Sequence, residues 1–223
     1  TLKLIVGQSQ ILAKGMSVLR EMETIKTQFD PLLGGAARAQ QRIEELYNFA
    51  ATTPFRLAEI AEASKTLEVL TKGAMSTGES LRMVGDAAAV SGQSMQTVAF
   101  WTGRLYDALK NGQPIGEATA RMQEMGLISG NIRNKLREMN DSGKSFLETM
   151  AVFEESMEKT KGGMEKLSKT LGGLESTLAD VRGQFSAKFA ENFMEGEKMA
   201  VSRLTELFAA FTEPIARVGA WLG

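Results

Sequence analysis

Residues 76–112 read STGESLRMVGDAAAVSGQSMQTVAFWTGRLYDALKNG, and this stretch decides the fold class. Its apolar residues recur at three- and four-residue spacing, which is typical of a helix with one buried face. Thr77 precedes the first apolar run, Ser94 precedes the second, and Asn111-Gly112 ends it. Because Ser and Thr favour helix N-caps and Gly favours helix ends, the stretch predicts two short amphipathic helices.

The remainder of the central sequence continues the same pattern on both sides of this stretch. Thr52 and Thr53 are predicted to cap one further helix, with Pro54 in its first helical position. Six short helices joined by connections of two to five residues indicate a compact bundle. The predicted helices span residues 36–51, 54–73, 78–92, 94–110, 115–125 and 129–140.

Both ends of the chain carry a heptad-like pattern that is typical of a coiled-coil seam. In the N-terminal segment, apolar residues recur until Pro31, Gly34 and Gly35, which are expected to stop the helix. In the C-terminal segment, the pairs at 162–163 and 172–173 predict hinges, because glycine weakens a helix. The predicted self-association seam comprises Met164, Leu167, Leu171, Leu174, Leu178, Val181 and Phe185, and the same spacing extends back to Met157 with Thr160 as a polar exception.

The pattern as a whole predicts an all-α protein with a compact central bundle flanked by long coiled-coil-like helices. We expect an N-terminal heptad helix over residues 1–33 and a compact helical domain over residues 34–142. Long C-terminal helices with glycine hinges are expected over residues 143–223. The sequence begins at Thr1 without an initiator Met and ends within an apolar stretch, so we expect a piece of a longer protein.

Composition excludes several kinds of enzyme. The chain contains neither His nor Cys, so a Ser-His-Asp triad, a thiolate nucleophile, a disulfide and an ordinary zinc site are all ruled out. Acidic pairs such as Glu44-Glu45 and Glu154-Glu155 lie on polar helix faces, where solvation is the simpler explanation. We expect no enzyme, no catalytic residue, no cofactor and no metal. The formal net charge is −1 with alternating signs, so no specific nucleic-acid partner is expected.

Gly143-Lys144-Ser145 resembles the end of a phosphate-binding loop, but the rest of that motif is missing. The motif requires a glycine five residues before Gly143, where this chain has Glu138, and a strand upstream, where the pattern is helical. A loop that starts a new helix explains these residues.

The apolar segment over residues 199–222 supports an alternative function. Arg203, Glu206, Glu213 and Arg217 interrupt it too often for a membrane-spanning helix. An oligomer seam is the preferred interpretation, and a membrane-interacting helix that lies in the interface is the alternative.

Four segments of the sequence stand out as a set, namely LYNFAATTPF at residues 46–55, LRMVGDAAAVSG at 81–92, LKNGQPIGEATARMQEMG at 109–126 and GMEKLSKTLGGLESTLADVRGQF at 163–185. In order and spacing they resemble the signature region of tail tape-measure proteins from long-tailed phages and prophages. The resemblance covers about residues 29–190. The motif residues, interpreted as packing and turn positions, are Thr53, Pro54, Phe55, Gly85, Asp86, Trp101, Gly112, Gly116 and Gly126.

The resemblance implies a structural and assembly protein of the virion. Such a protein lies inside the tail tube, sets tube length, scaffolds tube polymerisation and is released for DNA ejection. Its implied partners are the tail tube protein, tail assembly chaperones, tail tip proteins and further copies of itself, in a helical bundle expected to be a trimer. Its implied locations are the virion and, during assembly, the host cytoplasm. The resemblance also gives the membrane alternative a role, as a membrane-interacting helical module at the C-terminal segment that aids genome delivery through the host envelope. A lytic hydrolase, which some relatives carry as a separate domain, is a third hypothesis, but no segment here carries a pocket signature for it.

Overall fold

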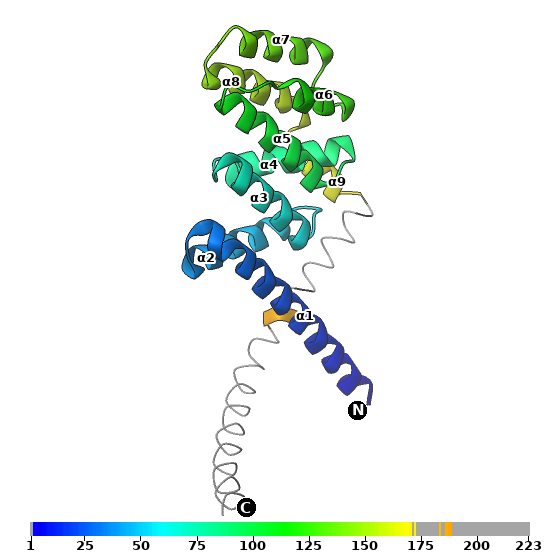
Figure 1. Ribbon diagram of the computed structural model, residues 1–223. Helices are drawn as coiled ribbons and strands as arrows, with labels where there is room; N and C mark the ends of the chain where they lie inside the picture. Colours follow the sequence, from blue (N-terminus) through cyan, green and yellow to red (C-terminus); the bar gives the residue numbers. More distant parts are fainter. Residues whose placement is uncertain (1, 171, 173–182, 184–185, 189–223) are drawn as a thin grey trace, which may run out of the picture. The chain divides into compact units, whose positions relative to one another are not determined.

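The computed structural model describes residues 2–170, 172, 183 and 186–188 (Figure 1). Over these residues the protein is all-α, as the sequence predicted, and contains no strand. A 3-10 turn, η1 (Glu158–Thr160), precedes the last helix. The helices are α1 (Leu2–Leu33), α2 (Ala36–Ala50), α3 (Leu57–Thr71), α4 (Gly78–Ser91), α5 (Met95–Lys110), α6 (Gly116–Glu124), α7 (Gly130–Asp141), α8 (Phe146–Met157) and α9 (Gly163–Ser168).

The chain divides into two compact units. The flanking unit comprises Thr1–Arg20 and Arg182–Gly223, and the central unit comprises Glu21–Val181. The central unit is larger than the domain predicted over residues 34–142. It includes the end of α1, because Phe29 is buried, and it includes α8, because Phe153 is buried in the same core.

In the flanking unit, the described residues show a close approach of two helical segments. Gly15 and Gly183 are both buried, as is Ala187. A Cβ atom added at Gly183 would lie 3.4 Å from Cγ2 of Val18. Within this unit, α1 therefore lies close to Gly183 at Val18, where glycine leaves no side-chain bulk.

Short polar side chains cap three of the central helices, which begin near the predicted starts at Ser94, at Ser129 and after the loop at 143–145. The Ser94 hydroxyl accepts a hydrogen bond from the backbone N–H of Thr97 at 3.1 Å, which starts α5. Ser129 does the same for α7 and Ser145 for α8. Each hydroxyl provides an acceptor for one of the N–H groups that the first turn of a helix leaves without a partner.

The predicted start of the third helix is wrong. Thr52 and Thr53 do not cap it, and Pro54 is not its first residue, because α3 begins at Leu57. The backbone N–H groups of both threonines instead donate to carbonyls at the end of α2 and extend its last turn.

Arg56 occupies the N-cap of α3 in place of those threonines. Its backbone N–H donates to the Glu59 carboxylate at 3.2 Å. Glu59 is the third residue of the helix, a position from which a glutamate side chain often accepts a hydrogen bond from the N-cap backbone.

The predicted end of the first helix is close to the observed one. Pro31 lies in the last turn of α1 without stopping it, and the helix ends at Leu33. Gly34 and Gly35 then adopt positive φ angles of 72° and 141°, which residues with a side chain rarely adopt.

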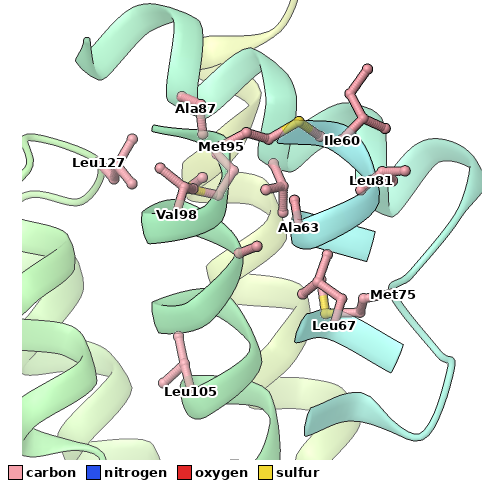
Figure 2. Packing of buried hydrophobic residues seen from close by; sticks show 14 of the residues in the cluster. Ile60, Ala63, Leu67, Met75, Leu81, Ala87, Met95, Val98, Leu105 and Leu127 are labelled. Carbon is pink, nitrogen blue, oxygen red and sulfur yellow. The ribbon is translucent and has the colours of Figure 1, made fainter. Parts of the chain in front are cut away.

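Helix α5 is the centre of the central unit. It packs against α3, α4, α6 and α8, and its pairing with α3 is the most extensive of any two helices (Figure 1). Figure 2 shows this part of the core, to which α5 contributes Val98 and Leu105 and α3 contributes Ala63 and Leu67. All four side chains are fully buried, so α3 and α5 share one apolar core.

The α3–α5 crossing depends on Gly103. A Cβ atom at this position would lie 2.8 Å from Cδ1 and 2.9 Å from Cβ of Leu70. The second atom is fixed to the backbone of α3, so a rotamer change of Leu70 cannot remove the overlap. Glycine at 103 therefore sets how closely the two helices approach.

The heptad segment that follows the central bundle is not one continuous helix. Helix α8 ends at Met157, η1 follows, and Gly162 has a left-handed φ of 75° before α9 begins. Met164, a predicted seam residue, is buried at 3% exposure inside the central unit. Leu167 is half-buried. The other predicted seam residues lie outside the described residues, namely Leu171, Leu174, Leu178, Val181 and Phe185.

We predict that Gly103→Ala lowers the free energy of unfolding by about 1–3 kcal/mol, because the new methyl group overpacks the α3–α5 interface. Gly116→Ala is the matched control, since a Cβ there meets nothing within 4 Å. It should leave stability unchanged or raise it by up to about 1 kcal/mol. Urea unfolding of both variants measures the difference, and equal stabilities would contradict the proposed role of Gly103.

Candidate functional site

The candidate site is the junction between α4 and α9, which is built around Asp86. This side chain is buried at 6% exposure in the middle of α4. Its Oδ2 atom accepts a hydrogen bond from the backbone N–H of Gly162 at 3.0 Å. Its Oδ1 atom accepts one from the backbone N–H of Met164 at 2.9 Å. One carboxylate thus links two parts of the chain that are 76 and 78 residues apart.

The local sequence explains why α9 needs this partner. Amide groups at the start of a helix have no acceptor within the helix, and a buried amide without an acceptor is costly. The N-cap of α9 is Gly162, which has no side chain to supply an acceptor. Asp86 supplies it from α4 instead.

Two glycines bring the helices close enough for these hydrogen bonds. A Cβ atom at Gly85 would lie 2.5 Å from the Met164 sulfur. A Cβ atom at Gly163 would lie 2.5 Å from the backbone oxygen of Asp86 and 2.7 Å from Cγ2 of Val90. Atoms of α9 occupy the space beside Gly85, and atoms of α4 occupy the space beside Gly163. An alanine at either position would therefore force neighbouring atoms to shift.

A surface hollow of about 250 Å³ lies beside the junction, between α4 and the α8–η1 segment. Its lining carries both signs of charge, and Lys161 pairs with Glu158 at 3.2 Å within it. Over the residues that the structure describes, no group of three or more acidic side chains is arranged to hold a metal ion. The lining residues are Glu79, Ser80, Arg82, Met83, Asp86, Glu154, Met157, Glu158, Thr160 and Lys161.

A second polar cluster ties α2 to α3. The Arg42 guanidinium pairs with the Glu68 carboxylate at 2.9 Å, and both side chains are largely buried, at 12% and 13% exposure. The Ser76 hydroxyl donates to the same carboxylate oxygen at 2.6 Å. The Ser64 hydroxyl donates to the backbone oxygen of Ser76 at 2.7 Å. These groups pair with one another inside the fold, which is typical of a structural cluster.

The other motif residues lie at separate helix ends and packing positions. Thr53 is buried, and its hydroxyl has no hydrogen-bond partner. Pro54 and Phe55 are half-buried in the turn between α2 and α3. Gly112 and Gly126 have positive φ angles of 62° and 73°.

The remaining motif positions lie on α5 and α6. Trp101 is half-buried on α5, with its ring 5.0 Å from that of Phe100 and 6.0 Å from the Arg121 guanidinium. Gly116 is the first residue of α6. Of all the motif residues, Gly85 and Asp86 are those that the structure brings together with the predicted seam, through Met164.

Sequence reasoning did not identify the partners of Asp86. It treated Gly162 and Gly163 as a hinge and Met164 as part of a seam between copies. One signal was present: Asp86 lies in a helix among alanines and apolar residues, and a buried carboxylate requires hydrogen-bond donors. The sequence does not reveal that the donors are backbone amides in a distant segment.

The Gly143-Lys144-Ser145 segment leads directly into α8, as expected, and follows helix α7 with no strand in between. The Ser145 hydroxyl accepts from the Glu148 N–H at 3.3 Å, and the Ser145 N–H donates to the Glu148 carboxylate at 3.1 Å. The Ser145 hydroxyl also donates to that carboxylate at 2.8 Å. These hydrogen bonds and the nearby Lys144 charge lower the pKa of Glu148.

No helix in the described part of the chain has the length and apolar character that crossing a membrane requires. The apolar segment over residues 199–222, on which the membrane hypothesis depends, lies outside that part.

Comparison of the chain with protein-family models, curated proteins and solved structures found no match.

We predict that Asp86→Ala lowers the free energy of unfolding by about 2–6 kcal/mol, because two amides lose their acceptor at about 1–3 kcal/mol each. Hydrogen exchange should accelerate at the amides of Gly162 and Met164. Asp107→Ala is the matched control, since Asp107 accepts an exposed hydrogen bond from Asn111. It should change stability by less than about 0.5 kcal/mol. Slow exchange at Gly162 in the Asp86 variant would contradict this role.

Glu148 provides a pH-dependent test of the helix cap. Because its pKa is lower in the folded state, the ionised carboxylate stabilises the fold above the pKa of the unfolded chain. That stabilisation is lost as pH falls through the folded-state pKa. Glu148→Gln should therefore be less stable than the wild type at neutral pH and equally stable in acid. In a Ser145→Ala background the pH dependence should shrink, and denaturant titrations across pH measure both effects.

Proposed function

We propose that this chain is the signature region of a tail tape-measure protein, a structural and assembly protein of a long-tailed phage. The sequence resemblance of the four segments motivates the proposal. The structural observation that supports treating these segments as one region is the hydrogen bonding of Asp86 to Gly162 and Met164. It joins the segment at residues 81–92 to the start of the segment at 163–185, so segments far apart in sequence belong to one folded unit.

In this proposal the two parts of the chain have different roles. The central unit is a compact element within a long tail protein. The heptad-patterned flanks form coiled-coil-like helices, expected to associate as a trimer, that run along the inside of the tail tube. An extended helix adds about 1.5 Å per residue, so the number of residues in the helical parts encodes a length.

The proposal also names partners and a fate. The tail tube protein polymerises around the helical bundle, assembly chaperones hold the chain before the tube forms, and tip proteins bind one end. The bundle leaves the tube when DNA passes. No step in this sequence requires turnover of a substrate, which agrees with a chain that lacks His and Cys.

Tail length tests the proposal directly. Insertion of about 21 heptad-patterned residues ahead of Gly15 in the complete tail protein should lengthen tails by about 30 Å, since each helical residue adds about 1.5 Å. The control is a flexible insert of the same size at Gly112-Gln113, an exposed turn of the central unit. It should leave tail length unchanged. Electron microscopy of the virions measures both, and unchanged tails after the heptad insertion would refute the ruler function.

A further inference from the structure

The heptad spacing continues across a place where the helix is broken. Met157 and Met164 are seven residues apart, and Leu167 follows at the next three-residue step. One uninterrupted helix would place these three side chains on one face. The structure instead ends α8 at Met157, inserts η1 and a left-handed Gly162, and starts α9 afresh.

The broken form is held by contacts within the central unit. Asp86 accepts from the backbone of Gly162 and Met164, and the side chains of Met157 and Met164 are buried at 1% and 3% exposure. Thr160, the polar residue in the heptad pattern, is also buried, and its hydroxyl donates to the backbone oxygen of Met157 at 2.7 Å. The apolar residues that a seam would present to another chain are therefore used inside this one.

We propose that the segment over residues 146–168 has two alternative states. In the docked state, α9 is held on α4 by Asp86. In the extended state, α8, η1 and α9 merge into one helix, and the face of Met157, Met164 and Leu167 packs against the same face of a second copy of this chain. The occupant in this proposal is a second copy, because a second copy presents the same face of Met157, Met164 and Leu167, and two helices with this seven-residue spacing can pack against each other.

Two glycines set the balance between these states. Gly162 and Gly163 disfavour a continuous helix, because glycine loses the most backbone entropy on becoming helical. They also permit docking, since Gly162 takes the left-handed turn and Gly163 lies against the Asp86 backbone. Replacing Gly163 with alanine should therefore raise the free energy of the docked state and lower that of the extended state.

The experiment uses the full 223-residue chain and the Gly163→Ala variant. Light scattering coupled to size-exclusion chromatography gives the mass, and circular dichroism at several concentrations gives the helix content. The matched control is Gly172→Ala. Gly172 lies in a similar Gly-Gly pair, is helical, and a Cβ there meets nothing within 4 Å. This control raises helix propensity without blocking docking.

We expect Gly163→Ala to increase the mass by about twofold or more relative to the wild type, with helix content kept or raised. Gly172→Ala should have the wild-type mass. A Gly163→Ala variant that keeps its helix content and the wild-type mass would overturn the proposal, as would an equal increase in both variants.

If Gly163→Ala loses its helix content, its mass does not test the proposal, and a second variant is used instead. Asp86→Asn removes one of the two acceptor oxygens without adding bulk to the junction. A larger mass for this variant, with accelerated hydrogen exchange at Gly162 and Met164, supports two alternative states. Accelerated exchange with the wild-type mass overturns them. The outcome is independent of tail length, so it does not depend on the tape-measure proposal.

Discussion

The carboxylate of Asp86 is the interaction on which the C-terminal part of the central unit depends. It sits in an apolar helix, where a buried acid is unfavourable unless donors surround it. The start of α9 supplies two such donors, and it needs an acceptor as much as Asp86 needs donors. Each group satisfies the other, so the contact fixes both which segment docks on α4 and in which register it docks.

Glycines turn that interaction into a close helix contact. Gly85 admits the Met164 side chain, and Gly163 admits the backbone of α4. Gly103 has the same role at the α3–α5 crossing against Leu70. At these positions glycine matters through its missing Cβ, whereas at Gly162 it matters through its left-handed backbone. The same residue type is therefore required for two different physical reasons.

Heptad spacing proved ambiguous about the partner. The spacing that includes Met157 and Met164 is compatible with a seam between copies and with burial inside one chain, because both environments reward an apolar face. The structure buries both methionines within the central unit. In the flanking unit, Gly183 lies beside Val18, so residues of the two heptad segments also contact each other. Periodicity specifies which face of a helix is apolar, and it does not specify what covers that face.

The sequence by itself determined the all-α class and most helix boundaries in the centre. Ser94, Ser129 and Ser145 act as N-caps, which local hydrogen bonding decides. Where local signals competed, the prediction failed: the last turn of α2 uses the backbone of Thr52 and Thr53, and Arg56 caps α3 instead.

Only the tertiary structure decided the partners of Asp86 and the close contact with Leu70 that leaves no room for a Cβ atom at position 103. Both depend on atoms from segments that meet only when the helices pack. A contact across 76 residues leaves no periodic trace in a single sequence, because its energy arises from the distance between two atoms and not from the spacing of residues along the chain.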